Sequence, residues 1–138
     1  VLSDAAKAGS KRVVGLETAE QQLGFFDAIP EPAQVQFLVS TVEELPKLGQ
    51  EMDRMVSSWA KGDPDTLATL LNDNLKESPE VAKLLLAERN ERWAEWIDKR
   101  MDQPGTVFVA VGAGHLAGPG SVQERLRAHE LKAERVRY

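Results

Sequence analysis

A chain of 138 residues with 42% hydrophobic side chains is long enough and apolar enough to fold as one domain. Its net charge of −5 arises from 22 acidic residues interleaved with 17 basic ones, which argues against a nucleic-acid or anionic-membrane partner. No apolar run approaches the roughly 20 residues that a membrane span needs. The chain has no cysteine, which excludes a disulfide framework and a thiolate zinc site.

The N-terminal segment predicts the end of a helix followed by a short strand. Residues 2–8 have the composition of a helix, and Gly9 is the residue expected just beyond its last turn. A chain that opens on the end of a helix is expected to lack preceding elements of its domain. Residues 12–17 then predict a strand, and this places Glu17 at the strand's carboxyl end.

Capping and proline signals predict two helices next. Thr18 suits the N-cap of a helix over residues 19–28, with Gln21 at the capping-box spacing. Pro32 opens a longer helix that Pro46 should kink or split. The apolar positions of this helix recur at helical spacing: Val35, Leu38, Val39, Val42, Leu45, Leu48, Met52, Met55, Val56 and Trp59.

Two further helices are predicted before the apolar run at residues 107–111. Asp63 suits an N-cap with Pro64 at the first helical position. The helix over residues 79–101 has an apolar stripe, and Arg89 falls inside that stripe. Its apolar members are Leu85, Trp93, Trp96 and Ile97.

The apolar run 107–111 predicts a strand buried on both faces, and a glycine-rich turn follows it. This order places His115 at the carboxyl edge of a parallel sheet, where α/β proteins hold their ligands. A helix over residues 122–128 and a strand over 132–137 complete a βαβ unit. The expected fold is therefore a helix-rich α/β domain with a small, mostly parallel sheet of about three strands, whose upstream strands are missing.

Three polar residues stand in apolar surroundings: Glu17, Arg89 and His115. Glu17 is either a solvated carboxylate, a partner of Arg89, or a metal ligand or general base at a strand edge. Arg89 either extends along the tryptophans to water or forms a buried pair, and Arg92 lies at the edge of the same stripe. His115 is either a loop residue or a ligand, and the other histidine, His129, is expected to lie far from it.

The glycine-rich turn has a second interpretation. Residues 112–117 fit the G-x-G-x-x-A form of a dinucleotide-binding fingerprint after a strand. Pro119 and Gly120 stand where the phosphate-binding helix should already be running, and no acidic residue ends the final strand. Both features count against this interpretation.

Four motifs in order across the chain resemble the TraB/GumN family, which is related to the Tiki metalloproteases. They lie in residues 14–22, 59–63, 88–94 and 111–118. The resemblance implies an α/β domain with two G-x-x-H motifs and a glutamate and, in the Tiki branch, a manganese- or cobalt-dependent peptidase. Residues 112–115 match the second G-x-x-H motif, whereas the first is absent, so the chain is expected to be a single partial domain, the C-terminal part of that fold.

The resemblance implies a metal-dependent, peptidase-like hydrolase. Glu17, Arg89, Asn90 and His115 would form the catalytic site, with His115 and Glu17 as metal ligands. The other hypothesis is a non-catalytic ligand-binding or regulatory module of the GumN type, linked to polysaccharide biosynthesis. We expect a peptide or small-molecule substrate, a homodimer, and little activity from these 138 residues alone; the family suggests a periplasmic or extracytoplasmic location.

Overall fold

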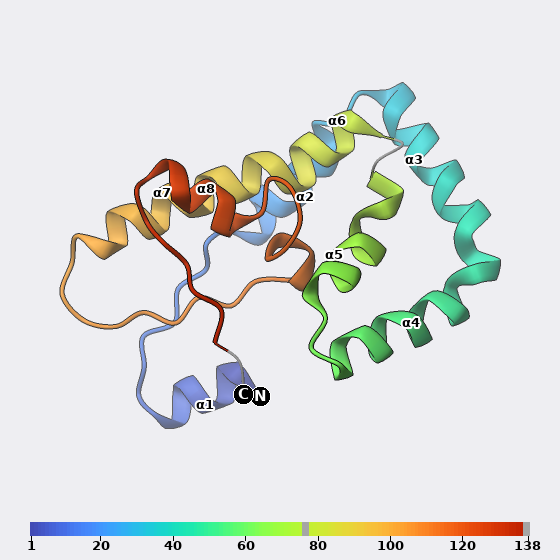
Figure 1. Cartoon of the computed structure of the whole chain (residues 1–138). Coiled ribbons are helices and arrows are strands. Elements are labelled where there is room, and N and C mark those ends of the chain that lie inside the picture. Colours follow the sequence, from blue (N-terminus) through green and yellow to red (C-terminus); the bar gives the residue numbers. More distant parts are fainter. Residues whose placement is uncertain (76–77, 137–138) are drawn as a thin grey trace.

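The computed structural model describes residues 1–75 and 78–136, which form helices joined by extended segments (Figure 1). The first half contains α1 (Leu2–Ala8), α2 (Ala19–Asp27), α3 (Glu31–Glu44), the 3₁₀ turn η1 (Leu45–Lys47), α4 (Leu48–Ala60), α5 (Pro64–Asn72) and η2 (Asp73–Leu75). The second half contains α6 (Pro79–Ala82), the π-helical turn η3 (Lys83–Ala87), α7 (Glu88–Met101), η4 (Ala113–His115) and α8 (Val122–Ala128).

The prediction of a small parallel sheet is wrong. Segments 12–17, 107–111 and 132–136 run without helix, but none of them pairs as a strand within the described residues, and residue 137 of the last predicted strand lies outside them. An apolar run becomes a strand only when another backbone supplies the ladder of hydrogen bonds. That partner is a non-local requirement, so an apolar run favours a strand without ensuring one.

Burial of the run 107–111 also differs from the prediction. Val107, Val109 and Val111 are half-buried, whereas Phe108 is 79% exposed. Only one side of this segment is therefore covered by protein, and the expected burial on both faces is wrong. The dinucleotide-binding interpretation loses its support as well, because its fingerprint requires a strand before the glycines.

The local signals for helix starts are confirmed. The Thr18 hydroxyl accepts a hydrogen bond from the Gln21 amide N–H at 3.1 Å, and Gln21 Oε1 accepts one from the Thr18 N–H at 2.8 Å. Asp63 accepts a hydrogen bond from the Thr66 N–H at 3.1 Å, with Pro64 as the first residue of α5. Each cap satisfies backbone donors that the first helical turn leaves free.

The predicted break at Pro46 is also confirmed. Helix α3 ends at Glu44, η1 contains the proline, and α4 begins at Leu48. The result is an arch of two helices on one side of the molecule, with α5 inside it (Figure 1).

Segments α6, η3 and α7 follow one another as a long helical rod, to which the other elements attach (Figure 1). This rod corresponds to the helix predicted over residues 79–101. Helix α8 packs on α7, and η4 packs on α5. The π-helical turn η3 ends directly before α7, two residues ahead of Arg89; such turns often accompany functional sites. Among the residues that the structure describes, few apolar side chains are buried: Ile29, Ala68, Val81, Trp93, Ala94 and Val122.

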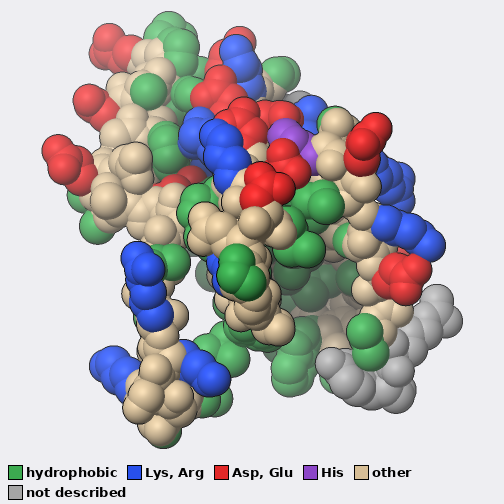
Figure 2. Space-filling view, turned by 90° about the vertical axis from the view of Figure 1, so that its left-hand side faces the viewer, with side chains coloured by type: hydrophobic (Ala, Val, Ile, Leu, Met, Phe, Trp, Pro, Cys, Tyr) green, Lys and Arg blue, Asp and Glu red, His purple; other side chains and the backbone are tan. Residues whose placement is uncertain are grey.

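The N-terminal helix α1 lies apart from the rod and buries none of its residues (Figure 1). Figure 2 shows acidic and basic side chains intermixed over the upper part of one face, as the interleaved charges of the sequence predict. Within the described residues, no helix combines the length and apolar character that crossing a membrane would require.

Candidate functional site

A two-pronged ion pair joins the N-terminal segment to the start of α7. Arg89 Nη2 donates to Glu17 Oε2 at 2.8 Å, and Arg89 Nε donates to Glu17 Oε1 at 3.0 Å. The Arg89 side chain is only 18% exposed and the Glu17 side chain only 5%. Arg89 therefore points inward and binds an anion, so of the two alternatives that the sequence left open for it, the buried pair is the one that forms. Arg92 is exposed and pairs loosely with Glu88 at 3.7 Å.

The Glu17 carboxylate has further donors around it. Trp93 Nε1 donates to Oε1 at 3.1 Å, and Gln22 Nε2 donates to Oε2 at 3.4 Å. Burial acts to raise the pKa of Glu17, but the hydrogen bonds and charge of Arg89, helped by Gln22 and Trp93, outweigh it and hold the pKa below its ordinary value. Glu17 is therefore an ionised carboxylate, with both oxygens engaged.

Aromatic rings surround the guanidinium of Arg89. Its Cζ atom lies 4.9 Å from the Trp93 ring centroid and 5.5 Å from that of Phe25. Its remaining nitrogen, Nη1, donates to the Leu85 carbonyl oxygen at 3.2 Å, one turn back along the rod. These contacts fix the orientation of the guanidinium from several directions.

A second polar pair lies beside the first. His115 is 9% exposed, and its Nδ1 lies 2.6 Å from Asn90 Oδ1. The Asn90 amide nitrogen donates to the Gly120 carbonyl at 2.8 Å, so the oxygen of the same amide faces His115 as an acceptor. An acceptor there requires the proton on Nδ1 and therefore leaves the Nε2 lone pair available.

The imidazole of His115 is kept neutral. Burial, followed by the positive charge of Arg89, lowers its pKa from 6.5 to about 4, against a smaller opposing effect of Glu17. Its ring packs on Trp93, with centroids 4.5 Å apart and planes at 48°. At neutral pH His115 can thus accept a hydrogen bond or ligate a metal ion through Nε2.

Trp93 joins the two pairs, because it donates to Glu17 and also packs on His115. The sequence placed Glu17 and His115 each at the carboxyl end of a predicted strand; the described part of the chain forms no sheet edge, and the two side chains instead lie on either side of Trp93 of α7. All four residues expected at the site, Glu17, Arg89, Asn90 and His115, belong to this cluster. The roles of Trp93, Gln22 and Phe25 were missed, although Trp93, four residues after Arg89, was the available signal.

The loop that carries His115 is held by α5. Asn72 Nδ2 donates to the Gly114 carbonyl at 2.9 Å, and a Cβ atom placed on Gly114 would lie 2.8 Å from Asn72 Oδ1. Such a short approach requires the Asn72 amide to move.

We therefore expect Gly114→Ala to lower the free energy of unfolding by about 1–2 kcal/mol, because the added methyl group displaces Asn72 from the loop. The matched control is Gly24→Ala on α2, where nothing lies within 4 Å of the new Cβ. It should raise stability by about 0.5–1 kcal/mol through helix propensity. Urea unfolding curves of the two variants measure both changes; equal stability would contradict the tight contact.

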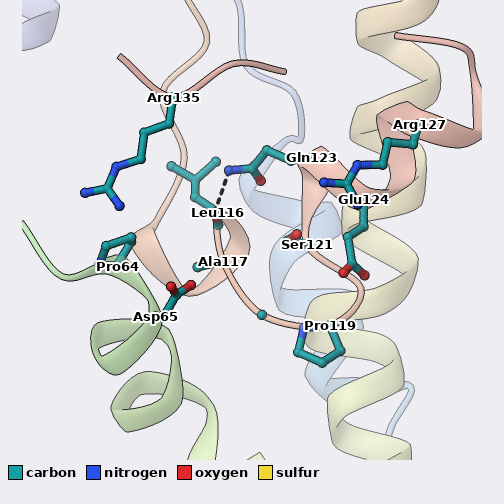
Figure 3. A pocket seen from close by; sticks show the side chains of 11 residues that line it. Pro64, Asp65, Leu116, Ala117, Pro119, Ser121, Gln123, Glu124, Arg127 and Arg135 are labelled. Atoms are coloured by element: carbon teal, nitrogen blue, oxygen red, sulfur yellow. Dashed lines mark hydrogen bonds between the residues drawn. The ribbon is translucent and has the colours of Figure 1, made fainter. Parts of the chain in front are cut away.

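An open cleft of about 440 Å³ lies along the other part of the same loop (Figure 3). Leu116, Ala117 and Pro119 form its apolar part, and Asp65 and Arg127 reach it from α5 and α8 (Figure 3). Gln123 bonds to the Leu116 carbonyl and so ties α8 to the loop. The cleft offers charges of both signs beside apolar atoms.

The expected divalent metal ion fits these residues only in part. His115 Nε2 suits one ligand position, but the oxygens of Glu17 are taken by Arg89 and Trp93. Nowhere in the described ranges do three His, Cys, Asp or Glu side chains gather in a way that could hold a metal. A full set of ligands would therefore require Glu17 to release one of its partners, or side chains from beyond the described residues.

Comparison with known proteins shows which family the sequence belongs to. The sequence is 30% identical over 126 residues to "Uncharacterized protein YbaP" of Escherichia coli (strain K12), and equally to the protein of that name from Shigella flexneri. The match covers 91% of this chain but 46% of each relative, so the chain spans about half of their length. No solved structure gives a significant match. A sequence model of the TraB/PrgY/gumN family matches residues 1–135, and the chain therefore belongs to that family.

Proposed function

We propose that the cluster around Trp93 is one part of a metal-dependent hydrolase site, of the peptidase type that the family resemblance implies. The observation that carries the proposal is the buried, neutral His115, whose Nδ1 is bound to Asn90 and whose Nε2 lone pair is thereby available. A ligating histidine typically has its other ring nitrogen held in this way. A divalent ion such as manganese or cobalt would supply a Lewis acid that activates water.

The residues of this chain would have separate roles in such a site. His115 supplies a ligand, and Asn90 fixes its tautomer while tying the loop to α7 through Gly120. Glu17 holds the guanidinium of Arg89, and Arg89 provides positive charge for a carboxylate or a developing oxyanion of the substrate. For Glu17 to act as a ligand or as a base, one of its oxygens must first leave Arg89 or Trp93.

The substrate would be a peptide or a small molecule that lies in the cleft of Figure 3. This cleft borders the loop that presents His115, and its mixture of apolar atoms with Asp65 and Arg127 suits a chain that carries both charged and apolar groups.

Metal binding by His115 is tested by nuclear magnetic resonance with Mn²⁺ as the probe. Addition of Mn²⁺ should broaden the ring signals of His115 first, and His115→Ala should weaken binding at least about tenfold. The matched control is His129→Ala, since His129 is bound to Asp98 at 3.0 Å outside the cluster. Broadening confined to His129, or unchanged affinity in His115→Ala, would contradict the proposal.

Both oxygens of Glu17 accept hydrogen bonds from Arg89 and Trp93, and this supports a second candidate function, that of a binding module without catalysis. In such a module Arg89 and Glu17 would serve only to hold the N-terminal segment against α7. A peptide hydrolysis assay with added Mn²⁺ or Co²⁺ discriminates between the two. Turnover that disappears in His115→Ala supports an enzyme, whereas peptide binding without turnover in a chain of the relatives' full length supports the module.

A further inference from the structure

The wall of the cleft in Figure 3 contains a hydroxyl group without a partner. Ser121 directly precedes α8 and is only 5% exposed, yet its side chain forms no cap bond to that helix. The hydroxyl has no other hydrogen-bond partner in the described part of the chain, and Ser121 lines the cleft (Figure 3). A serine at this position normally accepts a backbone N–H of the first helical turn. The Ser121 hydroxyl is therefore available to a ligand.

A second group in the same wall lacks a partner. Gln123 Nε2 donates to the Leu116 carbonyl oxygen, and this bond fixes which way the Gln123 amide points. Gln123 Oε1 is buried and accepts no hydrogen bond from the residues that the structure describes. A buried acceptor without a donor costs free energy, which an N–H group of a ligand would recover. Ser121 and Gln123 together favour a ligand that carries such a group.

Positive charge in the cleft is available at Arg127 of α8. Its side chain is exposed and forms no ion pair or hydrogen bond within residues 1–75 and 78–136. Arg135, which also lines the cleft, is instead bound to the Gly62 carbonyl oxygen. A guanidinium binds a carboxylate through two parallel hydrogen bonds, so Arg127 suits one carboxylate group of a ligand.

The remaining charges of the cleft argue against a polyanionic ligand. Asp65 lies on the α5 side of the cleft (Figure 3), and Glu124 of α8 accepts a hydrogen bond from the Gly120 N–H at 2.8 Å. Each further negative charge on a ligand would be repelled by these carboxylates. Leu116 and Pro119 offer apolar contacts instead, so the cleft favours a single carboxylate on an otherwise uncharged molecule.

The spacing of the two α8 residues fits the end of a peptide. Gln123 and Arg127 are four positions apart within α8 and so are neighbours on one face of the helix. In the last residue of a peptide, the carboxylate and the amide N–H are attached to the same carbon atom.

We propose that the cleft binds the carboxyl-terminal end of a peptide, with the terminal carboxylate on Arg127 and a backbone N–H beside Ser121 and Gln123. The proposal rests on the proposed function, because it takes this cleft as the substrate site. It narrows the substrate to peptides that are held by their free carboxyl terminus next to the loop of His115.

Nuclear magnetic resonance titration of the metal-free chain tests the proposal with two probes, N-acetyl-trialanine and its carboxyl-terminal amide. The peptide with the free carboxylate should bind at least about tenfold more tightly, and the shifted signals should centre on Ser121, Gln123 and Arg127. Arg127→Gln should remove this preference by weakening only the carboxylate peptide. Ser121→Ala should weaken both peptides about fivefold, without loss of stability, because the hydroxyl forms no cap bond.

The matched control is Arg54→Gln, which removes the same charge from an exposed position of α4 that does not line the cleft. It should leave the preference intact. No binding at millimolar peptide, equal binding of the two peptides, or a preference that survives Arg127→Gln overturns the proposal. So does a preference that Arg54→Gln abolishes. Tighter binding of inorganic phosphate than of the carboxylate peptide overturns it in favour of a phosphate-bearing ligand.

Failure of this proposal is distinguishable from failure of the hydrolase function, because the titration contains no metal ion. Binding of Mn²⁺ at His115 without a preference for the free carboxylate would refute this proposal alone. A preference for the carboxylate that depends on Arg127, without Mn²⁺ binding at His115, would refute the hydrolase function alone.

Discussion

Arg89→Ala should lower the free energy of unfolding by about 3–5 kcal/mol, because it leaves the Glu17 carboxylate buried without its cation. Glu17 keeps hydrogen bonds from Trp93 and Gln22, but neither of these donors carries a charge. The loss should be visible in urea or thermal unfolding at neutral pH. The N-terminal segment should also loosen from α7, since this pair bridges 72 positions of sequence.

Arg92→Ala is the matched control for this substitution. Arg92 lies three residues further along the same helix and also stacks on Phe25 at 4.9 Å, but it is exposed. Its removal should cost less than about 1 kcal/mol. The double variant Glu17→Gln with Arg89→Met should regain much of the loss, because it removes both buried charges together. If Arg89→Ala and Arg92→Ala were equally stable, the ion pair would contribute nothing to the fold.

The metal-free protein should lose stability as pH falls from about 6.5 towards about 4, because His115 resists protonation in the folded state. In that interval His115 is protonated in the unfolded chain but not in the native chain, so the unfolded state is stabilised relative to the native state. The difference between a pKa of 6.5 in the unfolded chain and one of about 4 in the native chain corresponds to a loss of about 3 kcal/mol in the free energy of unfolding. Below about pH 4 both states are protonated, and this contribution stays lost.

The lowered pKa of Glu17 acts in a more acidic range. Its stabilisation is complete above the unfolded pKa of 4.5 and is lost as pH falls through the lower folded pKa. Denaturant unfolding between pH 6.5 and 5 therefore measures the effect of His115 without that of Glu17. In this range His115 should lower the free energy of unfolding by about 2 kcal/mol. His115→Phe should flatten the profile in this window, while the control His129→Phe should keep it. Equal slopes for wild type and His115→Phe would show that His115 is accessible to protons in the folded state.

The local elements of this fold could be predicted from sequence with good accuracy. The cap of α2 at Thr18, the start of α5 at Pro64 and the break at Pro46 depend on groups within a few residues of each other. The position of Arg89 in the stripe with Leu85 and Trp93 also followed from helical phase, because helix geometry fixes which side chains share a face; its inward direction was left open. The family resemblance, too, was visible in the sequence, and the match to the family model confirmed it.

The sequence by itself determined where helices begin and end, and it singled out Glu17, Arg89 and His115 as polar residues in apolar surroundings. Only the tertiary structure decided that run 107–111 has no strand partner within the described residues, since strand pairing depends on a backbone remote in sequence. Tertiary contacts also decided that Glu17 is bound to Arg89 across 72 positions and that Asn90 fixes the tautomer of His115. No periodicity encodes such pairings, because they arise from where α7, the N-terminal segment and the His115 loop meet in space.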